Sequence, residues 1–312
     1  MSLVRRIGSK PWLWSFIAAL AAWLATILFT GGQGGGELMT AALTFATFFV
    51  IVGIGQMFVI TLGPGNVDLS IPATITLAGS VAMKVMDGND SLIAPGLAVA
   101  LACGLGVGLF NYGLILILRI PPIIATLSSS FLVQSTAITY GRGLRIKPPP
   151  ALADFTTAQL AGIPILALCI MLLAAAMGVV LHRTVYGRSV LAIGQNNRAA
   201  ALAGISVERV RFITYIGSAL LAALCGYLFS GFSGGSSLSM GEQYLLASIA
   251  VVVIGGTSVA GGSGNVPGIW GASLFLFLVQ SMLNTYQLSA GFRYLATGLI
   301  IIGVIAAAGS KR

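Results

Sequence analysis

The residues that could carry chemistry are few, and many of them gather in one polar segment, from His182 to Arg211. His182 is the only histidine of the chain. The seven acidic residues are spread along the whole length: Glu37, Asp68, Asp87, Asp90, Asp154, Glu208 and Glu242. A metal centre or a proton relay needs several ionisable side chains together, and a phosphate-binding loop needs a lysine directly after a glycine, a pair that this sequence lacks. We therefore expect no catalytic residues, no metal site, no bound cofactor and no ATP hydrolysis by the chain itself.

The polar segment contains the signals of a short helix. Asn196 or Asn197 can cap its amino end, because an asparagine side chain accepts hydrogen bonds from free backbone N–H groups. Residues 198–203 are strong helix formers. Gly204, followed by apolar Ile205, is typical of a left-handed helix stop closed by a hydrophobic contact. The sequence therefore predicts a short helix with an alanine face.

That alanine face could serve two purposes. Small side chains let a partner approach closely, so a partner groove could hold the helix as a rigid lever. The alternative is a surface helix that rests on lipid headgroups. Because alanine buries little apolar area, it makes a weak lipid anchor, and we favour docking to a protein.

The rest of the chain has the composition of a bilayer protein. Of 312 residues, 57% are hydrophobic and only 7% are charged, far fewer than the surface of a soluble globule needs. Stretches such as 92–110 lack the polar–apolar alternation of a β-barrel. The sequence predicts a single all-α domain over residues 1–312, a bundle of about ten transmembrane helices of about 17 to 25 residues each. We expect them near residues 12–30, 39–62, 70–86, 92–118, 123–140, 162–182, 210–231, 243–258, 268–284 and 292–308.

The basic residues predict how this bundle is oriented. Ten crossings place both termini on one side, with the loops near 63–69, 119–122, 183–209 and 259–267. That side carries Arg5, Arg6, Lys10, Arg119, Arg183, Arg188, Arg198, Arg209, Arg211, Lys311 and Arg312, against Lys84, Arg142, Arg145, Lys147 and Arg293 on the other. Lysine and arginine favour the cytoplasmic face, so both termini are expected there, and the net charge of +9 reflects topology rather than nucleic-acid binding.

Two segments interrupt apolar runs with glycine, proline and polar residues, at 61–70 and 254–268. Unwound backbone in a membrane is tolerated only where protein or a water-filled cavity satisfies it, so broken helices point to a solute pathway. GPGNV at 63–67 and GSGNV at 262–266 echo each other. The echo hints at an internal duplication, but the alternative of two tight turns between packed helices is favoured.

Four stretches, in order along the chain, resemble a known family. The polar segment, with Gly187-Arg188, Ala192-Ile193-Gly194, Asn196, Ala199-Ala200 and Gly204-Ile205, is similar to the cytoplasmic signature of permease subunits of ribose-type ATP-binding cassette (ABC) sugar importers. VDLS at 67–70 resembles the family's GGIDLS element, RIPPIIATL at 119–127 its PPFIATLG element, and residues 253–272 its glycine pattern. These stretches span most of the chain beyond residue 50.

The resemblance implies a permease domain in a bacterial inner membrane. Two permease chains, identical or paralogous, would form the channel, and a periplasmic binding protein would deliver a monosaccharide. Cytoplasmic ATPase subunits, which bind ATP and Mg²⁺, would grip the coupling segment 183–209. The family signature places the coupling residues at Gly187, Arg188, Gly194, Asn196, Ala199, Ala200, Ala203, Gly204 and Ile205.

The sequence departs from the family pattern near the expected pathway. Gly65-Asn66 stands where two glycines are common, Pro72 where a glycine is usual, and Ser263 where a basic residue is frequent. These departures leave the sugar open, and related permeases carry nucleosides or furanose signalling molecules. Two other classes stay open: an ion-coupled secondary transporter, which usually needs intramembrane acids, and a membrane enzyme, which needs a cluster of ionisable groups.

A neutral sugar calls for hydroxyl and amide hydrogen bonds beside apolar walls. Residues of these types lie near helix breaks or on apolar segments: Asn66, Ser70, Thr74, Ser128, Phe131, Gln134, Ser248 and Asn284. Each could instead hydrogen-bond between helices or pack in the core. Asp68 is expected to cap the following helix rather than to contact the sugar.

The main periplasmic loop, 141–161, is a candidate docking site for the binding protein. Arg142, Arg145 and Lys147 could meet acidic residues of that partner. The alternative is a proline-stiffened loop that covers the bundle. The stretch 231–243 is a second candidate on the same face.

Overall fold

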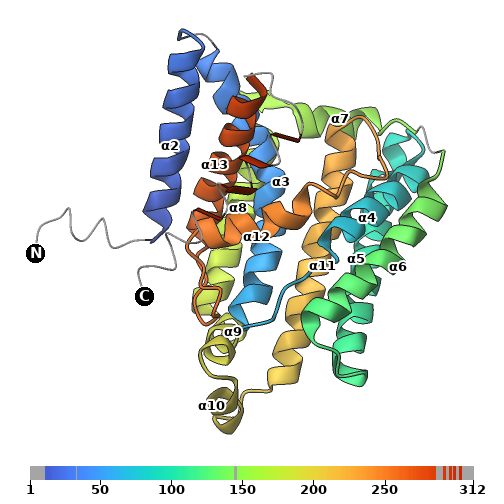
Figure 1. Ribbon diagram of the computed structural model, residues 1–312. Coiled ribbons are helices and arrows are strands. Elements are labelled where there is room, and N and C mark those ends of the chain that lie inside the picture. Colours follow the sequence, from blue (N-terminus) through green and yellow to red (C-terminus); the bar gives the residue numbers. More distant parts are fainter. Residues whose placement is uncertain are drawn as a thin grey trace, which may run out of the picture.

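The computed structural model describes residues 11–32, 34–143 and 146–285, with 291–292, 295–296, 298–299 and 302–303. Over these residues the chain is an all-α bundle whose long helices run side by side (Figure 1). Its elements are α2 (Pro11–Phe29), α3 (Gly35–Thr61), α4 (Ile71–Met86), the 3-10 helix η1 (Asp90–Leu92), α5 (Ile93–Ile117), α6 (Pro122–Gly141), α7 (Pro150–Thr157), β1 (Gln159–Leu160), β2 (Ile163–Pro164), α8 (Ile165–Arg183), α9 (Val185–Gln195), α10 (Asn197–Leu202), α11 (Val207–Phe232), α12 (Tyr244–Ile254) and α13 (Val266–Thr285).

Seven helices in the described part of the chain are long and apolar enough to span a membrane: α2, α3, α5 with η1, α6, α8, α11 and α13. The expected number of ten is therefore not confirmed. α4 is shorter, with 16 residues, and α12 has only 11. The tenth expected helix, near 292–308, falls largely outside the described residues.

The prediction that 243–258 crosses the membrane is wrong. An 11-residue helix rises about 16 Å, roughly half the hydrocarbon thickness. α12 begins only at Tyr244 and ends at Ile254 because glycines follow, and Gly256 takes a left-handed φ of 87°. α12 is thus a half-helix within the bundle.

The segment between α3 and α4 also differs from the expected cytoplasmic loop at 63–69. After Thr61 the chain turns back into the bundle, and Asn66 and Asp68 are buried. α4 then starts inside the bundle, with Pro72 in its first turn, where a missing N–H costs nothing. Each interrupted segment therefore adjoins a short helix: segment 61–70 precedes α4, and segment 254–268 follows α12.

α3 is the centre of the bundle. It is buried on all sides from Ala46 to Thr61, because this stretch is apolar all round. α11 packs against α3, α4 and α5, whereas α13 packs against α2 and α3. The fold thus places α12 against α3 and α13, and the short helix α4 against α5, α6 and α11.

The two ends of the bundle differ. At one end, here the α10 end, α9 and α10 project beyond the long helices (Figure 1). At the other, here the α7 end, lie α7 and an antiparallel hairpin in which Gln159 pairs with Pro164 and Leu160 with Ile163. The expected loop 141–161 is therefore largely ordered as a helix and a strand.

Candidate functional site

α10 is a short helix whose two ends are both closed. The Asn196 Oδ1 accepts a hydrogen bond from the Ala199 N–H at 3.0 Å, so the first of the two candidate asparagines is the cap. At the other end, the Ile205 N–H donates to the Ala200 carbonyl at 3.1 Å, and Gly204 has a φ of 85°. This is the left-handed glycine stop that the sequence predicts.

The outer side of α10 carries an apolar anchor. Ala199 and Ala203 are exposed, and Leu202 is 85% exposed. Ala200, by contrast, is buried, and Ile205 packs against the core. α10 forms the tip of its end of the molecule (Figure 1). A leucine held out on a capped helix suits a partner groove, and Leu202 was missed because the sequence argument considered only the alanines.

α9 connects α10 to the bundle. Gly187 is buried and Arg188 is exposed. The Tyr186 ring stacks on Phe58 of α3 with centroids 6.0 Å apart, and its hydroxyl oxygen lies 2.9 Å from the Thr214 Oγ1 of α11. Burial raises the pKa of Tyr186, and the hydrogen bond to Thr214 opposes part of that rise. α9 is therefore fixed to two spanning helices at once.

The end of α9 meets both helix breaks at a point that we name the glycine junction (Thr61, Gly194, Gln195 and Gly262). The Gly262 N–H donates to the Thr61 carbonyl at 2.9 Å, and the Gln195 Nε2 donates to the Gly262 carbonyl at 3.4 Å. A Cβ on Gly194 would overlap the Thr61 carbonyl oxygen, so only glycine fits. The coupling segment thus touches the end of α3 and the loop between α12 and α13.

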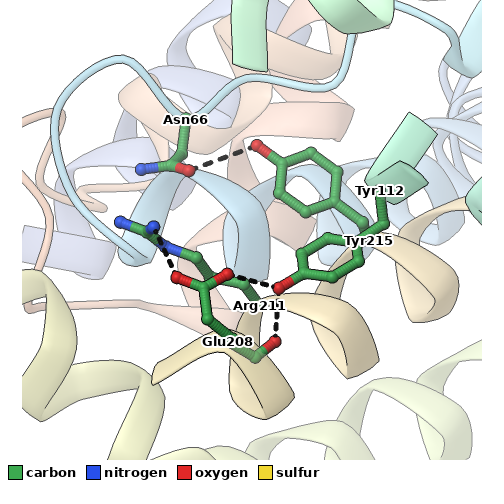
Figure 2. Close-up of polar contacts among 5 residues, drawn as sticks. All are labelled: Asn66, Tyr112, Glu208, Arg211 and Tyr215. Atoms are coloured by element: carbon green, nitrogen blue, oxygen red, sulfur yellow. Dashed lines mark hydrogen bonds and ion pairs between the residues drawn. The ribbon is translucent and has the colours of Figure 1, made fainter. Parts of the chain in front are cut away.

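A second connection, the polar bridge, starts in the first turn of α11 (Figure 2). The Tyr112 hydroxyl of α5 donates to the Glu208 carbonyl at 2.7 Å and to its Oε2 at 2.6 Å, and Arg211 lies 3.4 Å from the Glu208 Oε1. One turn further, the Tyr215 hydroxyl donates to the Asn66 Oδ1 at 3.2 Å. Because α11 begins directly after α10, the bridge links α10 to the buried segment 62–70.

Asp68 lies deeper in that segment and is only 1% exposed. Its Oδ1 accepts from the Ser70 N–H at 3.0 Å and from the Ser70 hydroxyl at 2.6 Å, and its Oδ2 accepts from the Ser218 hydroxyl at 2.8 Å. The N-cap of α4 is Ser70, so Asp68 is not the cap that the sequence predicts; it holds this cap residue in place and also clamps it to α11. Asn111 of α5 donates to the Ser70 hydroxyl at 2.7 Å.

This buried cluster is not fully paired. The Gln56 Oε1 accepts from the Asp68 N–H at 3.1 Å. Within the described part of the chain, however, the Gln56 Nε2 and the Asn111 Oδ1 have no hydrogen-bond partner. An unpaired buried polar group costs about 1–3 kcal/mol. The chain therefore gives up stability at the helix break, as proteins often do at functional sites.

The structure brings together only some of the predicted pathway residues. Asn66 and Ser70 belong to the connections just described, and the Thr74 hydroxyl donates to the Ser70 carbonyl at 2.9 Å. Ser248 is buried and donates to its own helix at 3.1 Å. The others lie elsewhere: Ser128 and Phe131 are exposed on α6, Gln134 of α6 donates to the Leu238 carbonyl at 2.8 Å, and Asn284 is exposed near the end of α13.

At the α7 end, Arg142 and Lys147 are exposed as a docking surface requires. Arg145 lies outside the described residues. Beside them, the Lys84 Nζ lies 4.1 Å from the centroid of the Tyr140 ring, a cation–π contact. The Asp90 carboxylate accepts from the Ala151 N–H at 2.9 Å and fixes the start of α7.

Sequence reasoning missed Asn111, Tyr112, Tyr215 and Ser218, although signals were present. Glu208, Arg211, Tyr215 and Ser218 follow one another at helical spacing on one face of α11. An asparagine within the apolar run of α5 is likewise a marker of an interhelical contact.

Interrupted helices within a membrane bundle are a feature of many transporters. Residues 38–305 match the model of a family described as the branched-chain amino acid transport system / permease component. The chain therefore belongs to this permease family.

Several curated import permeases are similar to this chain. The autoinducer 2 import system permease protein LsrC of Enterobacter sp. (strain 638) is 30% identical over 283 residues, which cover 88% of this chain and 82% of the relative. The ribose import permease protein RbsC of Bacillus subtilis (strain 168) is 32% identical over 261 residues, which cover 81% of this chain and 78% of the relative. The autoinducer 2 import system permease protein LsrD of Photorhabdus temperata is 28% identical over 318 residues, which cover 98% of this chain and 92% of the relative. No solved structure gives a significant match.

Proposed function

We propose that this chain is the single-domain transmembrane permease subunit of an ABC importer that moves a monosaccharide, of pentose or hexose type, from periplasm to cytoplasm. Separate ATPase subunits, which bind ATP and Mg²⁺, supply the energy, and the chain itself binds no cofactor. The observation that carries this proposal is α10, closed at both ends, with Leu202 exposed at the tip. Similarity to a ribose import permease supports a sugar.

The two connections from α10 explain how ATP hydrolysis would reach the pathway. ATPase closure moves α10, and a rigid, capped helix transmits that movement without bending. The glycine junction passes this movement to the end of α3 and to the α12–α13 loop. The polar bridge passes it to segment 62–70. Bistable packing of the half-helices α4 and α12 would then open the bundle to one side or the other.

The partners follow from this arrangement. A second permease chain, identical or paralogous, completes the channel in the bacterial inner membrane, and the ATPase sits at the α10 end, which is cytoplasmic together with both termini. The periplasmic sugar-binding protein docks at the α7 end, where Arg142, Arg145 and Lys147 meet its acidic residues. Nucleic acid is not a partner.

A nucleoside or a furanose signalling molecule is the alternative cargo of the same machine. Similarity to autoinducer 2 import permeases supports this alternative. An ion-coupled secondary transporter is disfavoured, because such transporters usually hold their coupling cation in a defined cage of acidic or other metal-ligating side chains. Among the described residues, no group of three such side chains lies together.

The test is co-purification, in lipid, of the chain with the ATPase encoded beside it. Leu202→Glu should lower the retained ATPase by about tenfold or more, because it would bury an unpaired carboxylate in the partner groove. Leu160→Glu, at a leucine that is 64% exposed at the α7 end, is the matched control and should retain the ATPase. Equal recovery with both variants, or no ATPase with the wild type, would refute the coupling role.

A further inference from the structure

An open groove of about 760 Å³ lies between the end of α11 and the start of α12. The side chains of Ser237, Ser239, Glu242 and Gln243 line it, above apolar Phe229 and Met240. Neither interrupted segment discussed above includes these residues. The first question is where in the membrane the groove lies.

The lengths of the helices place the floor of the groove within the bilayer. α3, with 27 residues, spans about 40 Å from the α7 end to the α10 end. Tyr244, the first residue of α12, packs against Phe49 near the middle of α3, with ring centroids 5.3 Å apart. Glu242, just before α12, therefore lies well below the α7 end. Gly241 also touches the Pro72 carbonyl at the buried start of α4.

The loop that forms the groove is held in place by α6. The Gln134 Nε2 of α6 donates to the Leu238 carbonyl at 2.8 Å. Gly234 and Gly235, with φ of 75° and 144°, let the chain turn down from α11. The groove thus runs from Ser233, at the α7 end, to the amino end of a half-helix inside the membrane.

Glu242 is the most informative residue of the lining. It is exposed, and it has no ion-pair partner among the described residues. An ionisable side chain at this depth faces a water-filled cavity or the bundle interior, not lipid. One turn further along α12, Leu246 is 67% exposed on the isolated chain. The second permease chain would cover this face and close the groove.

The chemistry of the lining selects a class of solute. Serine hydroxyls, an amide and a carboxylate can hydrogen-bond neighbouring hydroxyl groups of a sugar ring, and Phe229 with Met240 can pack against its C–H face. Among the described residues of the lining none is basic, so a phosphorylated or carboxylated solute would meet Glu242 without compensation. The lining therefore fits a neutral ring that carries adjacent hydroxyls.

We propose that this groove is the solute site of the permease, that Glu242 and the serines around it bind adjacent hydroxyls of a neutral sugar ring, and that Glu242 rejects anionic sugars. The proposal rests on the proposed function, since it assumes an importer. It assigns the site to residues 233–243 rather than to the interrupted segment 62–70.

Cysteine labelling tests the site in the full-length chain in spheroplasts. The native Cys103, Cys169 and Cys225 are replaced by alanine, and Glu242→Cys or Ser237→Cys is added. Each of these two cysteines should react with a membrane-impermeant sulphonated thiol reagent at a rate about tenfold or more above that of Leu172→Cys. The reason is that thiolates form in water and not in lipid. Leu172, 73% exposed on spanning helix α8, is the lipid-facing control, and Ser91→Cys at the α7 end is the positive control.

Protection then tests for the ligand. Millimolar D-ribose, D-galactose or uridine should slow the labelling of Ser237→Cys severalfold, whereas ribose 5-phosphate should not. Glu242→Gln should weaken protection by the neutral ring about tenfold or more, because hydrogen bonds to a carboxylate are stronger than those to a neutral amide. Asp154→Asn, which removes an exposed acid of α7, should leave protection unchanged.

Two results would overturn the proposal. Labelling of Glu242→Cys no faster than that of Leu172→Cys would show that no aqueous groove reaches this depth. Rapid labelling that none of the neutral solutes slows would show an aqueous groove without a solute site. Neither result bears on ATPase binding by Leu202, so the failure of this proposal and that of the importer function can be told apart.

Discussion

At the residue scale, the buried carboxylate of Asp68 places the strictest demand on the fold. Asn at this position keeps the shape but replaces one acceptor oxygen by an NH₂ group, so Ser70 or Ser218 loses its acceptor. Asp68→Asn should therefore destabilise the chain by about 1.5–3 kcal/mol, the usual value of a hydrogen bond to a charged group. Thermal unfolding of the purified protein in detergent measures this. Asp154→Asn, at an exposed acid, is the control, and equal midpoints for both variants would contradict the argument.

Tyr112 tests whether the polar bridge carries coupling as well as stability. Tyr112→Phe removes both hydrogen bonds to Glu208. Tyr227→Phe is the control, because it removes a tyrosine hydrogen bond outside the bridge, to the Ile93 carbonyl at 3.1 Å. Each should cost about 0.5–1.5 kcal/mol of stability. Only Tyr112→Phe should also reduce the stimulation of ATP hydrolysis by a sugar-loaded binding protein. Equal stimulation in both variants would limit the bridge to a structural role.

What the sequence could predict at this scale depended on distance along the chain. The Asn196 cap and the Gly204 stop involve residues a few positions apart, so local chemistry determines them. The contact of Asn111 with Ser70 joins residues 41 positions apart, and that of Ser218 with Asp68 joins residues 150 apart. Such pairs depend on how helices pack, which hydrophobic periodicity does not reveal.

At the element scale, the glycine junction is the narrowest contact between the coupling segment and the bundle. Gly194→Ala would push its Cβ into the Thr61 carbonyl, and backbone on both sides leaves no room for relaxation. We expect a loss of several kcal/mol or failure to fold, at or above the 1–3 kcal/mol typical of overpacking. Gly217→Ala is the control, because nothing lies within 4 Å of a Cβ there and alanine favours a helix. Yield and melting temperature of the two variants measure the difference, and equal values would show that the junction is loose.

Most spanning helices could be predicted because an apolar run of membrane length has few other uses. The exceptions share one cause. Glycine and proline at 61–70 and 254–268 mark the end of a helix, but they do not tell whether the chain then leaves the membrane or turns back into the bundle. The structure shows that segment 62–70 turns back and that α12 is short, and both features depend on long-range contacts such as that of Gly262 with Thr61.

At the scale of the whole molecule, charge separates the two ends. In the described part of the chain the α10 end carries Arg119, Arg183, Arg188, Arg198, Arg209 and Arg211, whereas Lys84, Arg142 and Lys147 lie toward the α7 end. Positive charge retained in the cytoplasm would orient the α10 end inward, where ATPase subunits are found. Glu242 and the groove of α12 would then open toward the periplasm, where a sugar-binding protein could deliver its ligand.

This orientation predicts the labelling of single cysteines by an impermeant maleimide. With the native cysteines removed, Ser91→Cys at the α7 end should react in intact spheroplasts. Ala201→Cys, exposed on α10, should react only after the membrane is opened. The reverse pattern would place the capped helix outside the cell, beyond the reach of any cytoplasmic ATPase, and would overturn the importer mechanism even if the solute groove were correctly assigned. Because the two sites lie on opposite ends of one bundle, a single pair of variants determines which end of the bundle faces the cytoplasm.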